Sequence, residues 1–163
     1  MTALYSISPL SEENAREITT WCYDPPYDLY DQEPVHLAGL LNPDYRYHQV
    51  LDEIGNLVGF CCYGLDAQVP GGEYHEKFHE VLDVGVGMRP ELTGQGLGET
   101  FVAEILDYGR TTYCPEEFRV SVAAFNKRSL KTFQKLGFKI QGSFMRELVE
   151  IEFHQMVKPV TEE

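Results

Sequence analysis

The stretch Val81–Gly109, VLDVGVGMRPELTGQGLGETFVAEILDYG, organises the rest of the chain. It predicts a β-strand over Val81–Met88, a glycine-rich turn over residues 93–98 and a helix that reaches about Tyr108. Pro90 ends the strand because proline has no N–H to donate to a sheet ladder. Spacings of four, four and three residues place a set of apolar side chains on one face of the helix: Leu97, Phe101, Ile105 and Tyr108.

A glycine-rich turn that opens a helix has a chemical use. The first N–H groups of a helix lack internal partners, and the helix dipole places partial positive charge at the same end. Glycines let an anion approach the backbone closely, and phosphate or pyrophosphate is the natural guest. The alternative is a glycine-containing helix entry that binds nothing.

Length and charge limit the class of protein. A chain of 163 residues is expected to form one domain with a sizeable core. The net charge of −13 argues against nucleic acid or an anionic membrane as a partner and favours a cationic substrate; the alternative is an acidic surface that serves solubility alone. The sequence holds no run of 18 apolar residues and no recognisable secretory leader, so we expect a cytoplasmic protein.

Cysteine and histidine spacing indicates no metal centre. The four cysteines lack a C-x-x-C spacing and are expected to be reduced thiols. His75 stands in a predicted loop over residues 66–78 and His79 directly follows it, without a third ligand at a suitable spacing, so no metal is expected.

The remaining patterns predict a mixed α/β chain. Two further buried-looking segments are a strand over Phe118–Ala124 and a helix over Lys127–Leu136, which Asn126 caps and Gly137 ends. Other strands are predicted over residues 2–8, 45–53, 57–65, 138–146 and 148–158, and other helices over residues 11–22 and 32–41.

Residues 21–30, WCYDPPYDLY, place four aromatic side chains around a Pro-Pro pair. Aromatic rings on a stiff loop can line a pocket and offer their faces to an ammonium group. The alternative is a loop that its aromatic residues fold onto the core. The first interpretation gives the candidate substrate-binding residues Trp21, Tyr23, Tyr27, Tyr30 and Glu33.

Two motifs resemble the GNAT superfamily of acetyl-CoA-dependent N-acetyltransferases. Residues 86–98, VGMRPELTGQGLG, are similar to the family's strand, proline and (Arg/Gln)-x-x-Gly-x-Gly turn. Residues 126–138, NKRSLKTFQKLGF, are similar to its Asn-x-x-Ala-x-x-x-Tyr-x-x-x-Gly-Phe helix. The resemblance covers essentially the whole chain and is least specific over the first 45 residues. It implies a single-domain α/β (α+β) fold over residues 1–163, with six to seven strands, about four helices and a splay between the strands at Val81–Met88 and Phe118–Ala124.

The resemblance also implies a site for acetyl-CoA. The pantetheine arm would lie along residues 86–88, the pyrophosphate would sit on the N–H groups of residues 94–99, and Asn126 would contact the arm. The implied cofactor-binding residues are Val86, Gly87, Met88, Thr93, Gly94, Gln95, Gly96, Leu97, Gly98, Glu99, Asn126 and Phe133.

Two departures from the family pattern affect this site. Thr93 stands where the family has Arg or Gln, so cofactor affinity would depend on Gln95, Arg89 or the Lys127–Arg128 pair. Phe133 replaces a tyrosine that can protonate the leaving thiolate, and phenylalanine has no proton to give.

A general base is expected because an alkylammonium must lose a proton before its nitrogen can attack. The positions that match the family's usual bases are Leu82, Val84 and Ser121, and the first two do not titrate. The nearest acidic residues, Asp83 and Glu80, are therefore the candidate catalytic residues.

The resulting hypothesis is an enzyme that transfers acetyl from acetyl-CoA to a primary amine by direct attack in a ternary complex. The acceptor is a small-molecule or peptide amine, and a homodimer is possible. The alternatives are another acyl-CoA as donor, a protein N-terminal amine as acceptor and a catalytically silent CoA-binding module. A dinucleotide oxidoreductase is disfavoured because the turn is not G-x-G-x-x-G.

Overall fold

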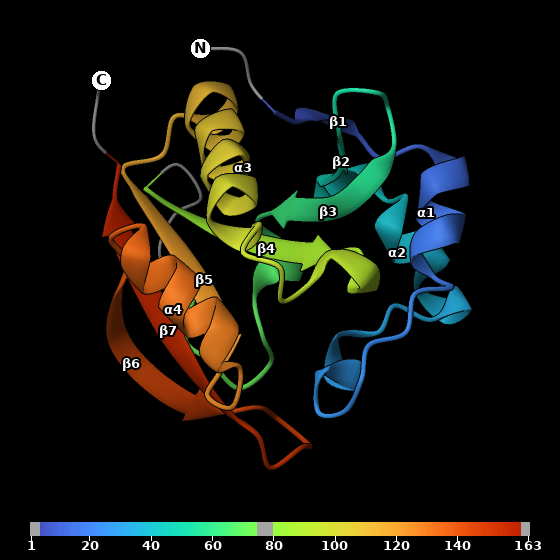
Figure 1. Ribbon diagram of the computed structural model, residues 1–163. Helices are drawn as coiled ribbons and strands as arrows, with labels where there is room; N and C mark the ends of the chain where they lie inside the picture. The colour runs from blue at the N-terminus through green and yellow to red at the C-terminus, as the bar shows by residue number, and fades with distance from the viewer. Residues whose placement is uncertain (1–3, 75–79, 161–163) are drawn as a thin grey trace.

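The computed structural model describes residues 4–74 and 80–160. Its centre is a seven-stranded sheet in the order β1-β2-β3-β4-β5-β7-β6 (Figure 1). The strands are β1 (Ser6–Pro9), β2 (Tyr47–Leu51), β3 (Leu57–Tyr63), β4 (Val81–Met88), β5 (Glu117–Ala123), β6 (Lys139–Met145) and β7 (Glu152–Pro159).

The β4–β5 pair is the parallel pair of this sheet and the place where it opens. Its register covers three positions, Val81–Asp83 against Glu117–Arg119. Beyond this rung, β4 stays paired with β3 as far as Met88, while β5 continues along β7. The two strands therefore diverge from a vertex at Asp83 and Arg119, which confirms the predicted splay.

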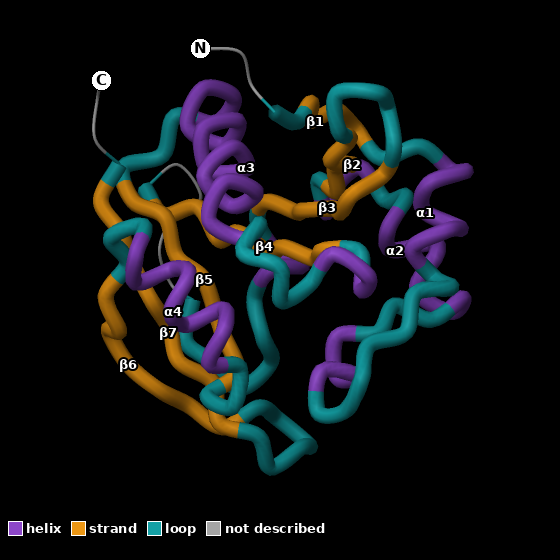
Figure 2. The backbone as a smooth tube through the Cα atoms, viewed as in Figure 1, coloured by secondary structure: helices purple, strands orange, loops and turns teal. Residues whose placement is uncertain are grey.

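Helices cover both faces of the sheet (Figures 1 and 2). Helices α3 (Gly98–Tyr113) and α4 (Lys127–Lys135) bury apolar side chains in the larger core, against β3, β4 and β5. Helices α1 (Glu12–Ile18) and α2 (Leu37–Leu40) enclose a second core with residues of β3. Side-chain caps fix two helix starts: Ser11 accepts from the Asn14 N–H, and Asn126 accepts from the Ser129 N–H.

The predicted elements are present, with changes at their ends. The helix expected over residues 32–41 is a 3-10 turn, Pro34–His36, followed by the short α2. Helix α3 runs to Tyr113, five residues beyond the predicted end, and stops where Cys114 adopts a left-handed backbone with φ of 51°. The aromatic segment contains a 3-10 turn over Tyr27–Tyr30.

The described part of the chain also bears on the expectations for membrane-spanning helices, metal-binding groups and cysteines. No helix in residues 4–74 and 80–160 is long and apolar enough to cross a membrane. The same residues contain no group of three or more His, Cys, Asp or Glu that could hold a metal ion. His75 and His79 lie outside the described residues. The four cysteines are free thiols.

Candidate active site

The splay leaves one edge of β4 without a strand partner. The Arg89 N–H donates to Val58 O, which lies on the β3 side at 2.9 Å. Because successive residues of a strand direct their polar groups to alternate edges, the N–H and C=O groups of Met88 and Val86 face the opening. Gly87 is required in this strand, because a Cβ there would lie 2.4 Å from the Phe60 ring. The free edge is suited to a ligand that carries amide groups, such as a pantetheine arm.

The glycine-rich turn lies at the end of this edge. Gly94 and Gly96 have φ of 72° and 78°, a conformation that favours glycine, and a Cβ on Gly96 would meet nothing within 4 Å. No side chain caps the start of α3. The turn uses its own polar side chains internally, because Thr93 Oγ1 donates to Pro90 O at 2.7 Å and the Gln95 amide donates to Glu91 O at 2.6 Å. The N–H groups at the start of α3 are therefore open to an anion.

The Arg89 guanidinium does not point towards this turn. Its guanidinium pairs with Glu17, donates to Leu57 O at 2.8 Å and lies 5.0 Å from the centre of the Trp21 ring. These contacts direct the charge towards α1.

Trp21 is a core residue. It is 6% exposed and packs against Phe60, with ring centres 6.1 Å apart, on the face opposite α3. With Phe60 beside it and Arg89 over its ring, Trp21 does not line a binding surface. The prediction that it binds the acceptor is therefore not supported.

Residues 23–30, which we call the tyrosine strap, bridge the mouth of the splay. At one end, the Tyr23 hydroxyl donates to Met88 O at 2.6 Å. At the other end, the Asn126 amide donates to the Tyr30 hydroxyl at 3.3 Å. Burial raises the pKa of Tyr23, so its hydroxyl stays a donor. The strap therefore holds Met88 and Asn126, two of the groups predicted to contact the cofactor.

The other predicted cofactor and acceptor residues have varied surroundings. Phe133 is 3% exposed and packs edge-on against Phe138, with ring centres 5.2 Å apart, so it belongs to the core and offers no surface to the cofactor. Tyr27 packs on Phe125, with ring centres 5.9 Å apart. Glu33 begins the 3-10 turn Pro34–His36, where its N–H donates to His36 Nδ1 at 2.9 Å.

Asp83 closes the vertex of the splay. It is 4% exposed, and both carboxylate oxygens accept from Arg119, at 2.6 and 2.9 Å. The Gln68 amide adds a bond of 3.0 Å. A carboxylate held in this way is poorly placed to accept a proton from a substrate, so the geometry corrects the expected catalytic role to a structural one.

Glu80 lies at the closed end of the same strand pair. Its carbonyl oxygen accepts from the N–H groups of Glu116 and Glu117 at 3.1 and 3.0 Å. Six residues of extended chain, about 20 Å, separate it from Val86. This separation argues against a catalytic role for Glu80.

A hydroxyl pair lies beside the vertex instead. The Tyr74 hydroxyl is 2.7 Å from Ser121 Oγ and accepts from the Val69 N–H at 3.0 Å, and Arg119 lies 4.7 Å from the centre of its ring. Ser121 follows Arg119 by two residues on β5 and shares its face. Sequence reasoning missed Tyr74 because 47 residues separate it from Ser121, and no local pattern carries a contact of that span.

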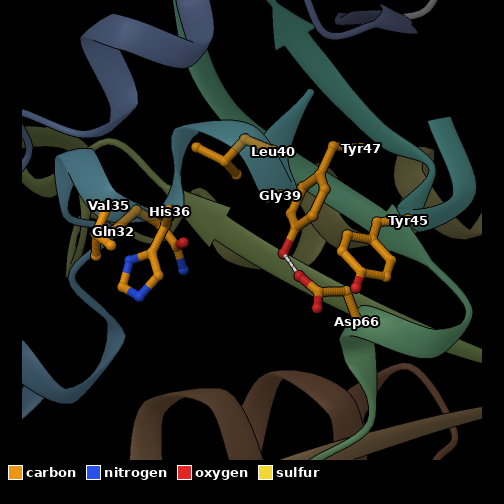
Figure 3. Close-up of a pocket in the computed structure, with 8 residues that line it drawn as sticks. All are labelled: Gln32, Val35, His36, Gly39, Leu40, Tyr45, Tyr47 and Asp66. Atoms are coloured by element: carbon orange, nitrogen blue, oxygen red, sulfur yellow. Dashed lines mark hydrogen bonds between the residues drawn. The ribbon is translucent and has the colours of Figure 1, made fainter. Parts of the chain in front are cut away.

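A cavity of about 200 Å³ lies between α2 with the segment before it, the start of β2 and the 3-10 turn Leu65–Ala67 that follows β3 (Figure 3). Tyr47 donates a hydrogen bond to Asp66 on one side, with Tyr45 beside that carboxylate, and Val35 and His36 lie opposite (Figure 3). Burial raises the pKa of Tyr47. The cavity is lined by Gln32, Val35, His36, Gly39, Leu40, Tyr45, Tyr47 and Asp66.

A splayed parallel strand pair beside an uncapped glycine-rich helix start is the arrangement that the two motifs predict for an acyltransferase that uses CoA. The Acetyltransferase (GNAT) family matches residues 12–138, and the chain belongs to this family. It is therefore an acetyl-CoA-dependent N-acetyltransferase.

The chain is similar to a curated relative and to solved structures over most of its length. The spermidine N(1)-acetyltransferase of Vibrio cholerae serotype O1 is 23% identical over 146 residues, which cover 89% of this chain and 79% of that protein. A mutant form of the spermidine N-acetyltransferase SpeG from Vibrio cholerae superposes with a TM-score of 0.72 at 18% identity, covering 97% of this chain and 95% of that one. The structure of yncA from Salmonella typhimurium with its cofactor acetyl-CoA gives a TM-score of 0.68 at 15% identity and covers 98% and 96% of the two chains. These superpositions confirm the fold.

Proposed function

We propose that this enzyme acetylates a primary amine of a small, multiply charged alkylamine, such as a polyamine. The use of acetyl-CoA as the acetyl donor rests on one observation, the splay between β4 and β5. This splay leaves the backbone groups of Val86 and Met88 beside the uncapped helix start at Gly98. These groups suit acetyl-CoA, with the amides of the arm on β4 and the pyrophosphate on the turn at Gly94 and Gly96.

The reaction transfers the acetyl group of a thioester to an amine. Bound acetyl-CoA supplies the carbonyl carbon to which the amine nitrogen bonds as the C–S bond breaks. Near pH 7 roughly one alkylamine in a thousand is neutral, so the ammonium proton must be removed first. The leaving thiolate has an ordinary pKa of about 8.5 and leaves without an acid at Phe133.

We assign the removal of the ammonium proton to the hydroxyl pair Ser121 and Tyr74. The pair lies next to the vertex, and its two oxygens are 2.7 Å apart. Ser121 Oγ would accept the proton from the ammonium nitrogen while its own proton passes to the Tyr74 oxygen, and the Tyr74 hydroxyl would release its proton to solvent water. Asp83 and Arg119 hold the strand that carries Ser121 in place.

The cavity at Asp66 supports a cationic acceptor. A carboxylate flanked by the rings of Tyr45 and Tyr47 can hold an ammonium by charge and by cation–π attraction. A volume of about 200 Å³ suits one aminoalkyl arm. The net charge of −13 also favours a cation, and the 23% identical relative is a spermidine N(1)-acetyltransferase.

The test measures thiol release with butylamine, 1,4-diaminobutane and spermidine as acceptors. Asp66→Asn should raise KM for the two polyamines on the order of tenfold and change KM for butylamine little, because only the polyamines carry a second ammonium. Asp44→Asn, an exposed acidic residue outside the cavity lining, is the matched control. Equal effects on all three amines would contradict the assignment of Asp66.

Two other outcomes would change the proposed function. Release with peptide N-termini, and with none of the small amines, would favour a protein acceptor. Tight acetyl-CoA binding with no release for any acceptor would favour a catalytically silent CoA-binding module.

A further inference from the structure

We propose that Arg128 is the cation that binds the pyrophosphate of acetyl-CoA, and that Tyr27 of the tyrosine strap positions its guanidinium. The inference rests on the proposed use of acetyl-CoA. The inference explains how the turn gains positive charge, because Thr93 brings none to the position where the family resemblance implies Arg or Gln.

The guanidinium of Arg128 lies against the glycine-rich turn. A Cβ on Gly94 would be 2.8 Å from Nη1 of Arg128. Arg128 is the second residue of α4, whose start is capped by Asn126, so its backbone is fixed beside the turn. The same helix approaches the start of α3, because a Cβ on Gly98 would be 3.4 Å from Oγ1 of Thr132. Arg128 therefore brings positive charge to the open N–H groups of α3.

Tyr27 holds the guanidinium without neutralising it. The Arg128 guanidinium carbon lies 4.4 Å from the centre of the Tyr27 ring, and Tyr27 packs in turn on Phe125. A ring face attracts a cation and leaves the N–H groups around the guanidinium plane available to bind an anion. A carboxylate partner would occupy those N–H groups.

Most of the other arginines are already paired with carboxylates. Four arginines form ion pairs with carboxylates: Arg16, Arg89, Arg110 and Arg119. Within residues 4–74 and 80–160, Arg128 forms no such pair. A chain with 26 acidic and 13 basic side chains thus keeps an uncompensated arginine at the turn where an anion is expected. A guanidinium matches phosphate oxygens with two parallel hydrogen bonds, which suits this role.

The test compares three acetyl donors by their kcat/KM with a single amine acceptor. Acetyl-CoA carries the pyrophosphate and the ribose 3′-phosphate, acetyl-dephospho-CoA keeps the pyrophosphate alone, and acetylpantetheine lacks both. Arg128→Gln should lower kcat/KM roughly 10- to 100-fold for the first two donors and leave acetylpantetheine unchanged. Lys135→Gln removes an exposed cation from the last turn of the same helix as the matched control, and it should change kcat/KM for each donor less than about threefold.

Tyr27 has its own pair of variants. Tyr27→Phe keeps the ring and should retain the wild-type preference for acetyl-CoA over acetylpantetheine. Tyr27→Ala should lose roughly three- to tenfold of that preference, because Arg128 is no longer held at the turn. Calorimetric melting of each variant confirms that it is folded.

Three results would overturn the inference. A loss in Arg128→Gln that is equal for acetylpantetheine would show a general effect on the enzyme. A loss that disappears with acetyl-dephospho-CoA would assign Arg128 to the 3′-phosphate. An equal loss in Lys135→Gln would show a non-specific effect of charge. A wild-type protein that uses none of the donors would instead contradict the proposed function.

Discussion

Asp83 illustrates how burial decides what a carboxylate does. An acidic residue inside an apolar strand suggests a catalytic base, yet Asp83 meets Arg119 and Gln68 across the sheet and is 4% exposed. The pair lies on the last rung before β4 and β5 separate. We infer that Asp83 fixes the point at which the cofactor opening begins.

Asp83→Asn should therefore act mainly on stability. Removing one member of a buried ion pair leaves the Arg119 charge uncompensated and costs on the order of 3 kcal/mol. Urea unfolding measures this loss. The protein that remains folded should lose the same fraction of kcat at pH 7 and at pH 9, because Asp83 does not take the amine proton. A loss of activity that is large at pH 7 and recovers at pH 9 would restore Asp83 as the general base.

At the scale of elements, the tyrosine strap is the segment that joins the two sides of the opening. Tyr23 reaches β4 through Met88 O, while Tyr30 reaches the start of α4 through Asn126. The partners on β4 and α4 are groups that acetyl-CoA is expected to contact. We therefore expect cofactor binding to rearrange the strap.

The fluorescence of Trp21 can report this rearrangement. Trp21 is the single tryptophan, is 6% exposed and lies two residues before Tyr23. Acetyl-CoA should change its fluorescence emission. Tyr23→Phe removes a hydrogen bond worth about 1 kcal/mol and should make Trp21 more accessible to acrylamide before any ligand is added. Tyr45→Phe, which removes a hydroxyl from a tyrosine outside the strap, should leave the quenching unchanged. Identical quenching in wild type and Tyr23→Phe would show that the strap is not held through Met88.

The elements were predictable where a local pattern specifies them. The strand over Val81–Met88 has the predicted bounds because an apolar run ends at Pro90, and α4 begins where Asn126 caps it. The 3-10 turn at Pro34–His36 was predicted as part of a longer helix, because short turns and helices share the same local spacing.

The site was predictable only in its backbone part. The glycine-rich turn and the free edge of β4 follow from the motifs, because both depend on residues close in sequence. The pairs Asp83–Arg119, Tyr74–Ser121 and Tyr27–Arg128 join segments 36 to 101 residues apart, so no spacing rule could reveal them.

At the scale of the whole molecule, the acidic charge and the cofactor oppose each other. A net charge of −13 attracts a polyamine and repels the phosphates of acetyl-CoA. The fold offsets this repulsion locally, with the open helix start at Gly98 and the uncompensated Arg128. The central claim is therefore that the turn over residues 93–98 binds the pyrophosphate of acetyl-CoA.

Isothermal calorimetry with acetyl-CoA tests that claim most directly, on the wild type and two variants. Gly96→Glu places a side chain and a negative charge in open space at the turn, whereas Gly55→Glu makes the same change at another glycine with positive φ and open surroundings, in the β2–β3 hairpin. We predict that the wild type and Gly55→Glu bind acetyl-CoA alike and that Gly96→Glu shows no detectable heat of binding. Equal binding by Gly96→Glu and the wild type would contradict the assignment of the turn as the cofactor site.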